Sequence, residues 1–174
     1  MAKNCLNKLA SGITVACTIP QVGVKDIYLM HAEDVTFTYG TTGEILTSEF
    51  AASANSYKVE GYKQNIQVTA SLKTTDSSAR VDTSVTFKVP YSSDTRAFIN
   101  TLALGKFYVL VVFNDGDITV LGDSSPLECS SADFDSNANA KMATVTLASP
   151  EGSAGNQARV IAEAVANTII SKSV

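Results

Sequence analysis

The clearest pattern of apolar and polar positions begins at Ala79. Over residues 79–89 the two classes alternate, with Thr83 as the one polar residue on the apolar side. A period of two predicts a strand with one buried and one exposed face. Pro90 is expected to end this strand, because proline has no N–H to donate to a sheet.

A helix is expected directly after this strand, at about residues 94–104. One of Ser92, Ser93 and Asp94 can cap its first turn by accepting a backbone hydrogen bond. Gly105 is placed to take the left-handed conformation beyond the last turn. The apolar side chains that recur at helical spacing are Ala97, Phe98, Ile99, Leu102 and Ala103.

The next segment predicts a central strand and a hairpin. Residues 107–113 are apolar at every position, which is typical of a strand buried on both faces. Asp115 and Gly116 form the strongest hairpin signal in the chain, so residues 117–121 are expected to return antiparallel.

Shorter patterns predict further strands. Residues 66–72 and 79–89 should form a long antiparallel hairpin around a polar hinge at 73–78. Gly61 lies in an extended segment, 56–72, where the parity of apolar positions changes, which indicates a bulge. Residues 122–139 are expected to be a loop. The remaining predicted strands are 13–19, 26–31, 35–39, 44–47 and 140–147.

The two ends of the chain are assigned separately from the domain. Residues 1–11 are expected to be an arm, and 149–174 a linker followed by a C-terminal assembly segment. Within it, residues 157–170 predict a helix that Asn156 could cap; an alternating strand would bury less apolar surface. The helix could pack on a neighbouring subunit or fold back on its own sheet.

The whole pattern predicts a mainly β (α+β) fold. Residues 12–148 should form an antiparallel β-sandwich or barrel with one internal flanking helix and a C-terminal helix outside it. A chain of 174 residues favours one such domain. Its net charge of −4 and its low content of Lys and Arg argue against tight binding to nucleic-acid phosphates. No segment has the ~20 apolar residues of a membrane span.

The cysteines and the one histidine do not form a recognisable site. Cys5, Cys17 and Cys129 lack CxxC spacing, so free thiols in a reducing compartment are expected, with a Cys5–Cys17 bridge as the alternative. A lipidated Cys17 after a short apolar segment is a second alternative. His31 has no catalytic partner in view and is expected to be a core or edge residue.

Other chemical motifs are incomplete or missing. Residues 133–139 match the start of a calcium loop, but Ala138 replaces the turn glycine and Thr144 the bidentate glutamate. Glycine-rich phosphate loops do not occur. The chain has no tryptophan with which to stack sugars. The sequence therefore predicts no catalytic, cofactor-binding or metal-binding residues, and a protein that is not an enzyme.

A family resemblance rests on several segments together. They are a short arm, a cysteine-containing segment, residues 23–29 and 31–36, the polar-faced hairpin, the helix at 94–105, and residues 107–116 with 120–122. This pattern resembles small virion proteins of tailed bacteriophages, in particular tail-tube or tail-ring proteins of the crAss-like group. The resemblance covers most of residues 12–148.

The resemblance implies a non-enzymatic structural protein of the virion, made in the host cytoplasm. Such subunits close into homo-oligomeric rings that stack, contact other tail or connector proteins, and let genomic DNA pass without binding it specifically. Faces rich in Ser, Thr, Asn and Gln with net negative charge would form the channel wall. The alternatives are a head-decoration or head–tail connector protein and a cell-surface lipoprotein or pilin-like adhesin.

Overall fold

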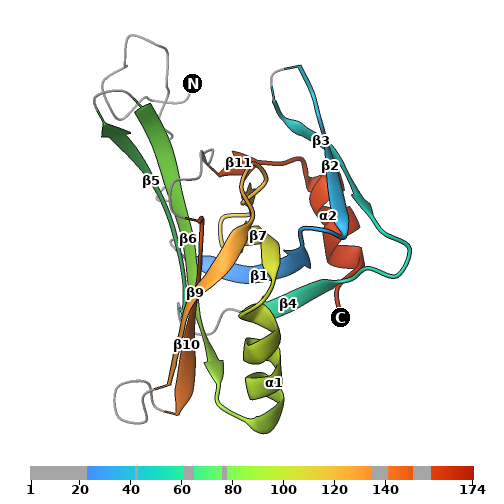
Figure 1. Cartoon of the computed structure of the whole chain (residues 1–174). Coiled ribbons are helices and arrows are strands. Elements are labelled where there is room, and N and C mark those ends of the chain that lie inside the picture. Colours follow the sequence, from blue (N-terminus) through green and yellow to red (C-terminus); the bar gives the residue numbers. More distant parts are fainter. Residues whose placement is uncertain (1–22, 42, 61–64, 76–77, 135–140, 151–157) are drawn as a thin grey trace, which may run out of the picture.

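The computed structural model describes residues 23–41, 43–60, 65–75, 78–134, 141–150 and 158–174. They form a β-rich fold with two helices, in agreement with the predicted class (Figure 1). The elements are β1 (Val24–His31), β2 (Val35–Tyr39), β3 (Ile45–Phe50), β4 (Ser56–Glu60), β5 (Ile66–Thr75), β6 (Ser78–Pro90), α1 (Ser93–Leu102), β7 (Lys106–Phe113), β8 (Ile118–Leu121), β9 (Leu127–Phe134), β10 (Met142–Ala148), β11 (Arg159–Val160) and α2 (Glu163–Ser171).

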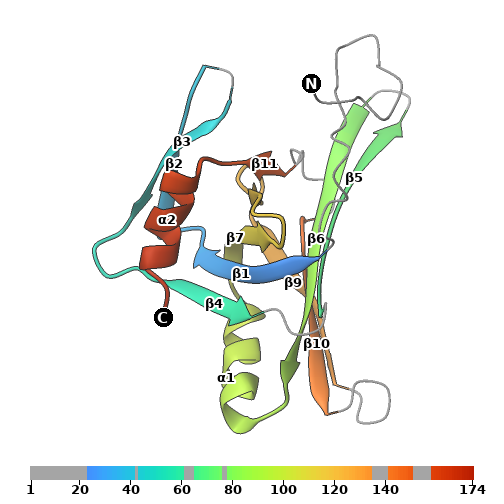
Figure 2. The same ribbon diagram turned by 180° about the vertical axis from the view of Figure 1, so that it is seen from behind.

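One branched antiparallel sheet contains most of the strands. Its main path runs in the order β11-β8-β7-β9-β10-β6-β5, while β1 pairs with the other edge of β7 and with β4. The strands β2 and β3 form a separate two-stranded sheet. The long strands β5, β6, β10 and β9 run along one side of the molecule, and β1 and β4 cross their direction (Figures 1 and 2).

Two hydrophobic cores lie on opposite faces of β1 and β7. Ile27 and Leu29 face the first core, between these strands, the long strands and α1. Met30 and Leu110 face the second core, which α2 and the β2–β3 sheet cover on the other side (Figure 2). The strands β1 and β7 therefore form the middle of three layers. Their apolar side chains are buried on both faces, as the apolar segment 107–113 predicted.

Helix α1 begins as predicted but ends differently. Ser92 is the N-cap, and its hydroxyl accepts a hydrogen bond from the Thr95 N–H at 3.2 Å. The C-cap is Ala103, and Gly105 does not have the positive φ that the sequence suggested. Gly105 instead permits a close approach, because an added Cβ would lie 2.3 Å from Cζ of the buried Phe107 ring.

Both predicted hairpins are present. Gly116, with φ of 95°, forms the turn between β7 and β8. The pairing of β5 with β6 runs from Ile66 opposite Phe87 to Thr75 opposite Ser78, so most of the expected polar hinge belongs to the strands.

The predicted loop at 122–139 is wrong, because β9 occupies Leu127–Phe134 within it. Strand β9 contains a bulge, where its register on β10 shifts between Thr146 and Leu147. The extra residue changes which positions face the core, so the sequence of β9 shows no continuous alternation of apolar and polar residues. The extended segment 56–72 forms two strands with different partners, and the bulge expected at Gly61 lies outside the described residues.

The C-terminal helix is confirmed, but it begins after Ala162 and not after the expected cap, Asn156. Its buried face packs in the second core of its own chain, the second of the two predicted positions. Strand β11 precedes it, and Arg159 there pairs with Asp123 and donates to the Gly43 carbonyl. The predicted arm at 1–11, the strand at 13–19, Cys5 and Cys17 lie outside the described residues.

Candidate functional site

The outward side of the long strands is a polar surface formed by the described residues. No described helix or strand covers it (Figures 1 and 2). We call this surface the polar face, and its polar side chains, assigned from strand register, are Gln67, Thr69, Ser71, Lys73, Arg80, Asp82, Ser84, Thr86, Lys88, Glu128, Ser131, Asp133, Thr144 and Thr146.

Hydroxyl groups link neighbouring strands across the polar face. The Thr69 and Ser84 hydroxyls, which are opposite each other on β5 and β6, lie 2.7 Å apart. The Thr86 and Thr146 hydroxyls join β6 to β10 at 3.1 Å. Such pairs satisfy each other while leaving the surface wettable, so the face does not need another protein layer to cover it.

The described polar face does not carry the net negative charge that the resemblance implied. By strand register its charged side chains are the anions Asp82, Glu128 and Asp133 and the cations Lys73, Arg80 and Lys88. Lys106 of β7 lies opposite Glu128 and pairs with it at 3.3 Å, so the cations at least balance the anions among the described residues.

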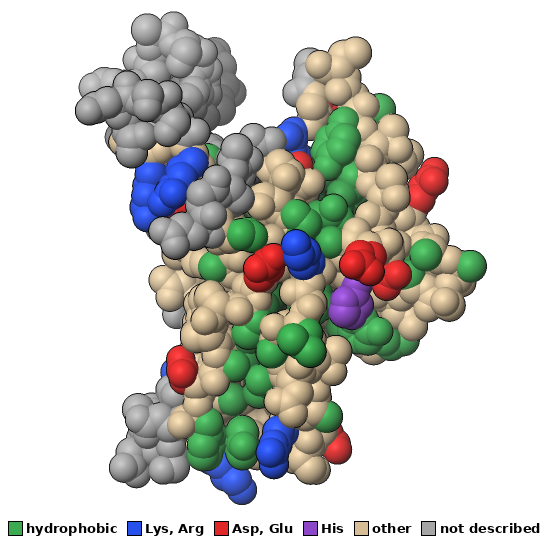
Figure 3. All heavy atoms as spheres, in the orientation of Figure 1, with side chains coloured by type: hydrophobic (Ala, Val, Ile, Leu, Met, Phe, Trp, Pro, Cys, Tyr) green, Lys and Arg blue, Asp and Glu red, His purple; other side chains and the backbone are tan. Residues whose placement is uncertain are grey.

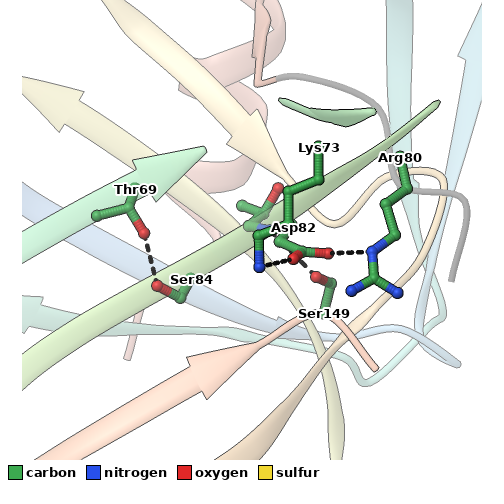
Figure 4. Close-up of polar contacts among 7 residues, drawn as sticks. Thr69, Lys73, Arg80, Asp82, Ser84 and Ser149 are labelled. Carbon is green, nitrogen blue, oxygen red and sulfur yellow. Dashed lines mark hydrogen bonds and ion pairs between the residues drawn. The ribbon is translucent and has the colours of Figure 1, made fainter. Parts of the chain in front are cut away.

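Three charged side chains, Lys73, Arg80 and Asp82, lie together near the turn end of the β5–β6 hairpin (Figure 4). Lys73 Nζ lies 2.7 Å from one carboxylate oxygen of Asp82, and Arg80 Nε lies 3.2 Å from the other. The hydrogen bond from Lys73 is the main cause that holds the pKa of Asp82 below its usual range, and the Arg80 charge adds to it. Asp82 is therefore ionised at neutral pH and holds both cations.

An open depression of about 420 Å³ lies beside this cluster. Ser149, which follows β10, is also at its edge, and the Ser149 hydroxyl accepts a hydrogen bond from the Thr83 N–H at 3.1 Å. The sequence pattern predicts no site among these residues. The available signal is the shared parity of Arg80 and Asp82 on the polar side of the predicted strand, whereas Lys73 falls in the predicted hinge.

His31 lies at the end of β1 and is half-buried, as expected for an edge residue. Its ring centroid is 4.8 Å from that of Phe107 and 6.0 Å from that of Tyr57. The side chain reaches the surface, where it is purple in Figure 3. It also lines an apolar pocket of about 270 Å³ beside α1. The structure does not place it with the Lys73–Asp82–Arg80 cluster.

The other residues named by the sequence do not come together. Cys129 is a free thiol in β9, and burial raises its pKa. Asp133 and Phe134 lie in β9, and residues 135–140 of the calcium-like segment lie outside the described residues. Within the part of the chain that the structure describes, no group of three His, Cys, Asp or Glu side chains could hold a metal ion. Neither described helix has the length and apolar character needed to cross a bilayer.

No protein-family model, curated protein or solved structure matches this chain significantly.

Proposed function

We propose that this chain is a non-enzymatic structural subunit of a bacteriophage tail, which assembles into rings around a DNA-conducting channel. The observation that carries the proposal is the uncovered polar face, which ends in two unlike strand edges. The sequence resemblance supplies the virion context. Under this proposal the polar face lines the channel, and the edges join neighbouring subunits.

The two edges are unpaired over most of their described length. Strand β5 ends the sheet and pairs only with β6 among the described residues. Strand β9 pairs with β7 only through Leu127 and Glu128, so its remaining residues pair on the β10 side alone. Unpaired backbone N–H and C=O groups at such edges can pair with another chain.

The strand directions allow these edges to meet. The four long strands are antiparallel to each neighbour in the order β5-β6-β10-β9. Because their number is even, β9 of one copy and β5 of the next would also run antiparallel. Copies joined in this way repeat head to tail, which is the contact that closes a ring by rotation.

Charge is compatible with the same pairing. The β5–β6 side of the polar face carries Lys73 and Arg80, whereas the unpaired part of β9 carries Asp133; Glu128 lies where β9 pairs with β7 and is bound to Lys106 at 3.3 Å. Lys73 lies toward the hairpin turn and Asp133 toward the opposite end of the face, so a seam staggered along the strands would bring these opposite charges together. Two β5 edges meeting each other would instead bring cations together.

Mass photometry and negative-stain electron microscopy over a range of protein concentrations test the proposal. Ring-shaped oligomers are expected for the native chain. Asp133→Lys makes both edges cationic and should abolish the rings, whereas Asp117→Lys in the β7–β8 turn, with the same change in charge, should retain them.

A native chain that stays monomeric at high concentration would contradict the proposal. Rings that survive Asp133→Lys unchanged would reject the β9 edge as the seam. Binding of a monomeric chain to empty phage heads would instead support the head-decoration alternative.

A further inference from the structure

We propose that Lys73 and Arg80 form a phosphate-binding site on the polar face, and that the backbone of passing DNA supplies the phosphate. The choice of DNA as the source rests on the proposed function. The phosphate site itself rests on the geometry of the hairpin cluster. The proposed function expects a channel wall that only lets DNA pass. The phosphate site would add a contact between this wall and the DNA backbone that is independent of base sequence.

The placement of the two cations is unfavourable for the fold alone. Lys73 and Arg80 are direct partners across β5 and β6. Like charges at opposed positions destabilise a strand pair. Asp82 is the only acidic side chain that an ion pair joins to either cation among the described residues, so the described part of the cluster has one net positive charge. A ligand with negative charge would compensate that excess.

The guanidinium of Arg80 is held in a position suited to such a ligand. Asp82 contacts its Nε, and no described residue forms an ion pair or hydrogen bond with its terminal nitrogens. In Figure 4 the dashed contact between Arg80 and Asp82 runs from Nε and none runs from the terminal nitrogens. Two terminal N–H groups in one plane match two oxygens of a phosphate, and prior orientation by a carboxylate lowers the entropy lost on binding.

The surroundings add space and a neutral donor. The depression of about 420 Å³ beside the cluster can admit a phosphate group. The Ser149 oxygen accepts a hydrogen bond from the Thr83 N–H, which leaves the serine O–H as a donor. Lys73, with 59% of its side chain exposed, can turn from Asp82 toward a second anion.

The overall charge of the protein limits the strength of one such contact. A single cluster with one excess charge, on a chain of net charge −4, would bind DNA weakly. A ring would present one cluster from each copy to the same duplex, so the contacts would act together. The expected binding is therefore independent of base sequence, sensitive to salt, and stronger in the assembled state.

Fluorescence anisotropy of a labelled DNA duplex at low salt tests the site with the full chain. The double variant Lys73→Gln/Arg80→Gln should bind about tenfold more weakly, with a shallower dependence of log K on log salt. The control is Lys25→Gln/Lys172→Gln, which removes two exposed cations elsewhere and should change affinity less than about twofold. Equal losses in both variants, or native protein without DNA binding, would overturn the assignment to DNA.

A second arm uses inorganic phosphate and NMR. Phosphate should shift the Arg80 side-chain and Ser149 amide signals of the native chain, and should leave the Ser149 amide signal of the Lys73→Gln/Arg80→Gln variant unchanged. Phosphate binding without DNA binding would retain the site and reject DNA as its source. Absence of both would reject the site. Circular dichroism on each variant establishes that the fold is intact.

Particle size measured on the same samples separates this inference from the proposed function. Site-dependent DNA binding by a chain that forms no rings would retain the site and reject the ring. Rings without such binding would do the reverse. If Lys73→Gln/Arg80→Gln loses its rings while DNA affinity is unchanged, the two cations bind a carboxylate of the next copy, and the phosphate proposal is wrong.

Discussion

Strands β6 and β7 follow each other in the sequence with α1 between them, yet they differ in exposure: β7 is buried on both faces and β6 on one. In β7 the side chains of Val109, Leu110 and Val111 are fully buried although they point alternately to two faces. In β6 only one face is buried, with Val85 and Phe87 in the first core and the alternate residues on the polar face.

The difference lies in what covers each strand. The second face of β7 is closed by α2 and the β2–β3 sheet, whereas no described element covers the outer side of β6. Burial on both faces suits a strand whose role is to hold the fold together. A sheet face left open and satisfied by hydroxyl pairs is available for contact with other molecules, which is why the proposals above concern that face.

The largest expected effect is on the free energy of unfolding, and it separates two leucine-to-alanine substitutions, one under α2 and one on β5. Leu110→Ala should lower the free energy of unfolding by about 3 kcal/mol, because it leaves a cavity under α2. Leu72→Ala should change it by less than about 0.5 kcal/mol, because Leu72 on β5 is 57% exposed. Chemical denaturation measures both. Similar losses in the two variants would remove the contrast between the regions.

Gly105→Ala tests how tightly the buried side of the molecule is packed, because it adds a methyl group next to the first core. The added methyl group would meet the buried Phe107 ring, so we expect a loss of about 2 kcal/mol in the free energy of unfolding. Gly116→Ala is a comparison at a glycine with open space, where the positive φ is the source of strain. Thermal unfolding of Gly105→Ala together with Phe107→Leu should recover part of its loss; no recovery would contradict the proposed clash.

Ser56→Ala tests how α2 is attached over the second core. The buried Ser56 hydroxyl donates to the Ile169 carbonyl at 2.8 Å, and its removal should reduce the free energy of unfolding by about 1–2 kcal/mol. Ser171→Ala removes an exposed hydroxyl that also bonds α2, and should cost less than about 0.5 kcal/mol. Hydrogen exchange at the α2 amides should accelerate only in Ser56→Ala. Equal acceleration in both variants would contradict the attachment.

The smallest effect concerns Asp82 on the polar face. Its depressed pKa means that its ion pairs stabilise the folded chain at neutral pH, and that this contribution is lost as pH falls below the usual range of an aspartate. Lys73→Met should raise the pKa of Asp82 toward its ordinary value, measured by NMR titration of the carboxyl carbon. Lys88→Met is the control on the same face, and a pKa unchanged by Lys73→Met would reject the pairing.

The elements predicted correctly are those whose signals lie within a few neighbouring residues. The alternation at 79–89, the Ser92 cap and the turn at Gly116 depend on local periodicity and local hydrogen bonds. The apolar positions of 107–113 indicated burial on both faces, although not which elements would cover them.

Features that depend on distant partners were missed, namely the strand β9 and the start of α2. In β9 the apolar residues Leu127 and Cys129 share one parity, while Ala132 and Phe134 share the other, because the bulge lies between them. The helix α2 begins later than its periodicity suggested, since Arg159 and Val160 pair with β8. A single sequence contains no information about that pairing.

The candidate site could be predicted only in part. The polar side of the long hairpin was expected from alternation, but the meeting of Lys73, Arg80 and Asp82 depends on the register of β5 against β6. Lys73 falls in the segment 73–78, which the sequence pattern predicts as a hinge and not as part of the strand. The open edges of β5 and β9 could not be predicted, because an edge is defined by which strands fail to pair.

The position of α2 has a consequence for how the protein is made. This helix is the last described helix in the chain, yet it covers strands as early as β1. While the chain leaves the ribosome, the core that contains Met30 and Leu110 therefore cannot close until α2 (Glu163–Ser171) has been made. A chain stalled before α2 would present this apolar surface to chaperones and proteases, whereas the long hairpin could already have formed.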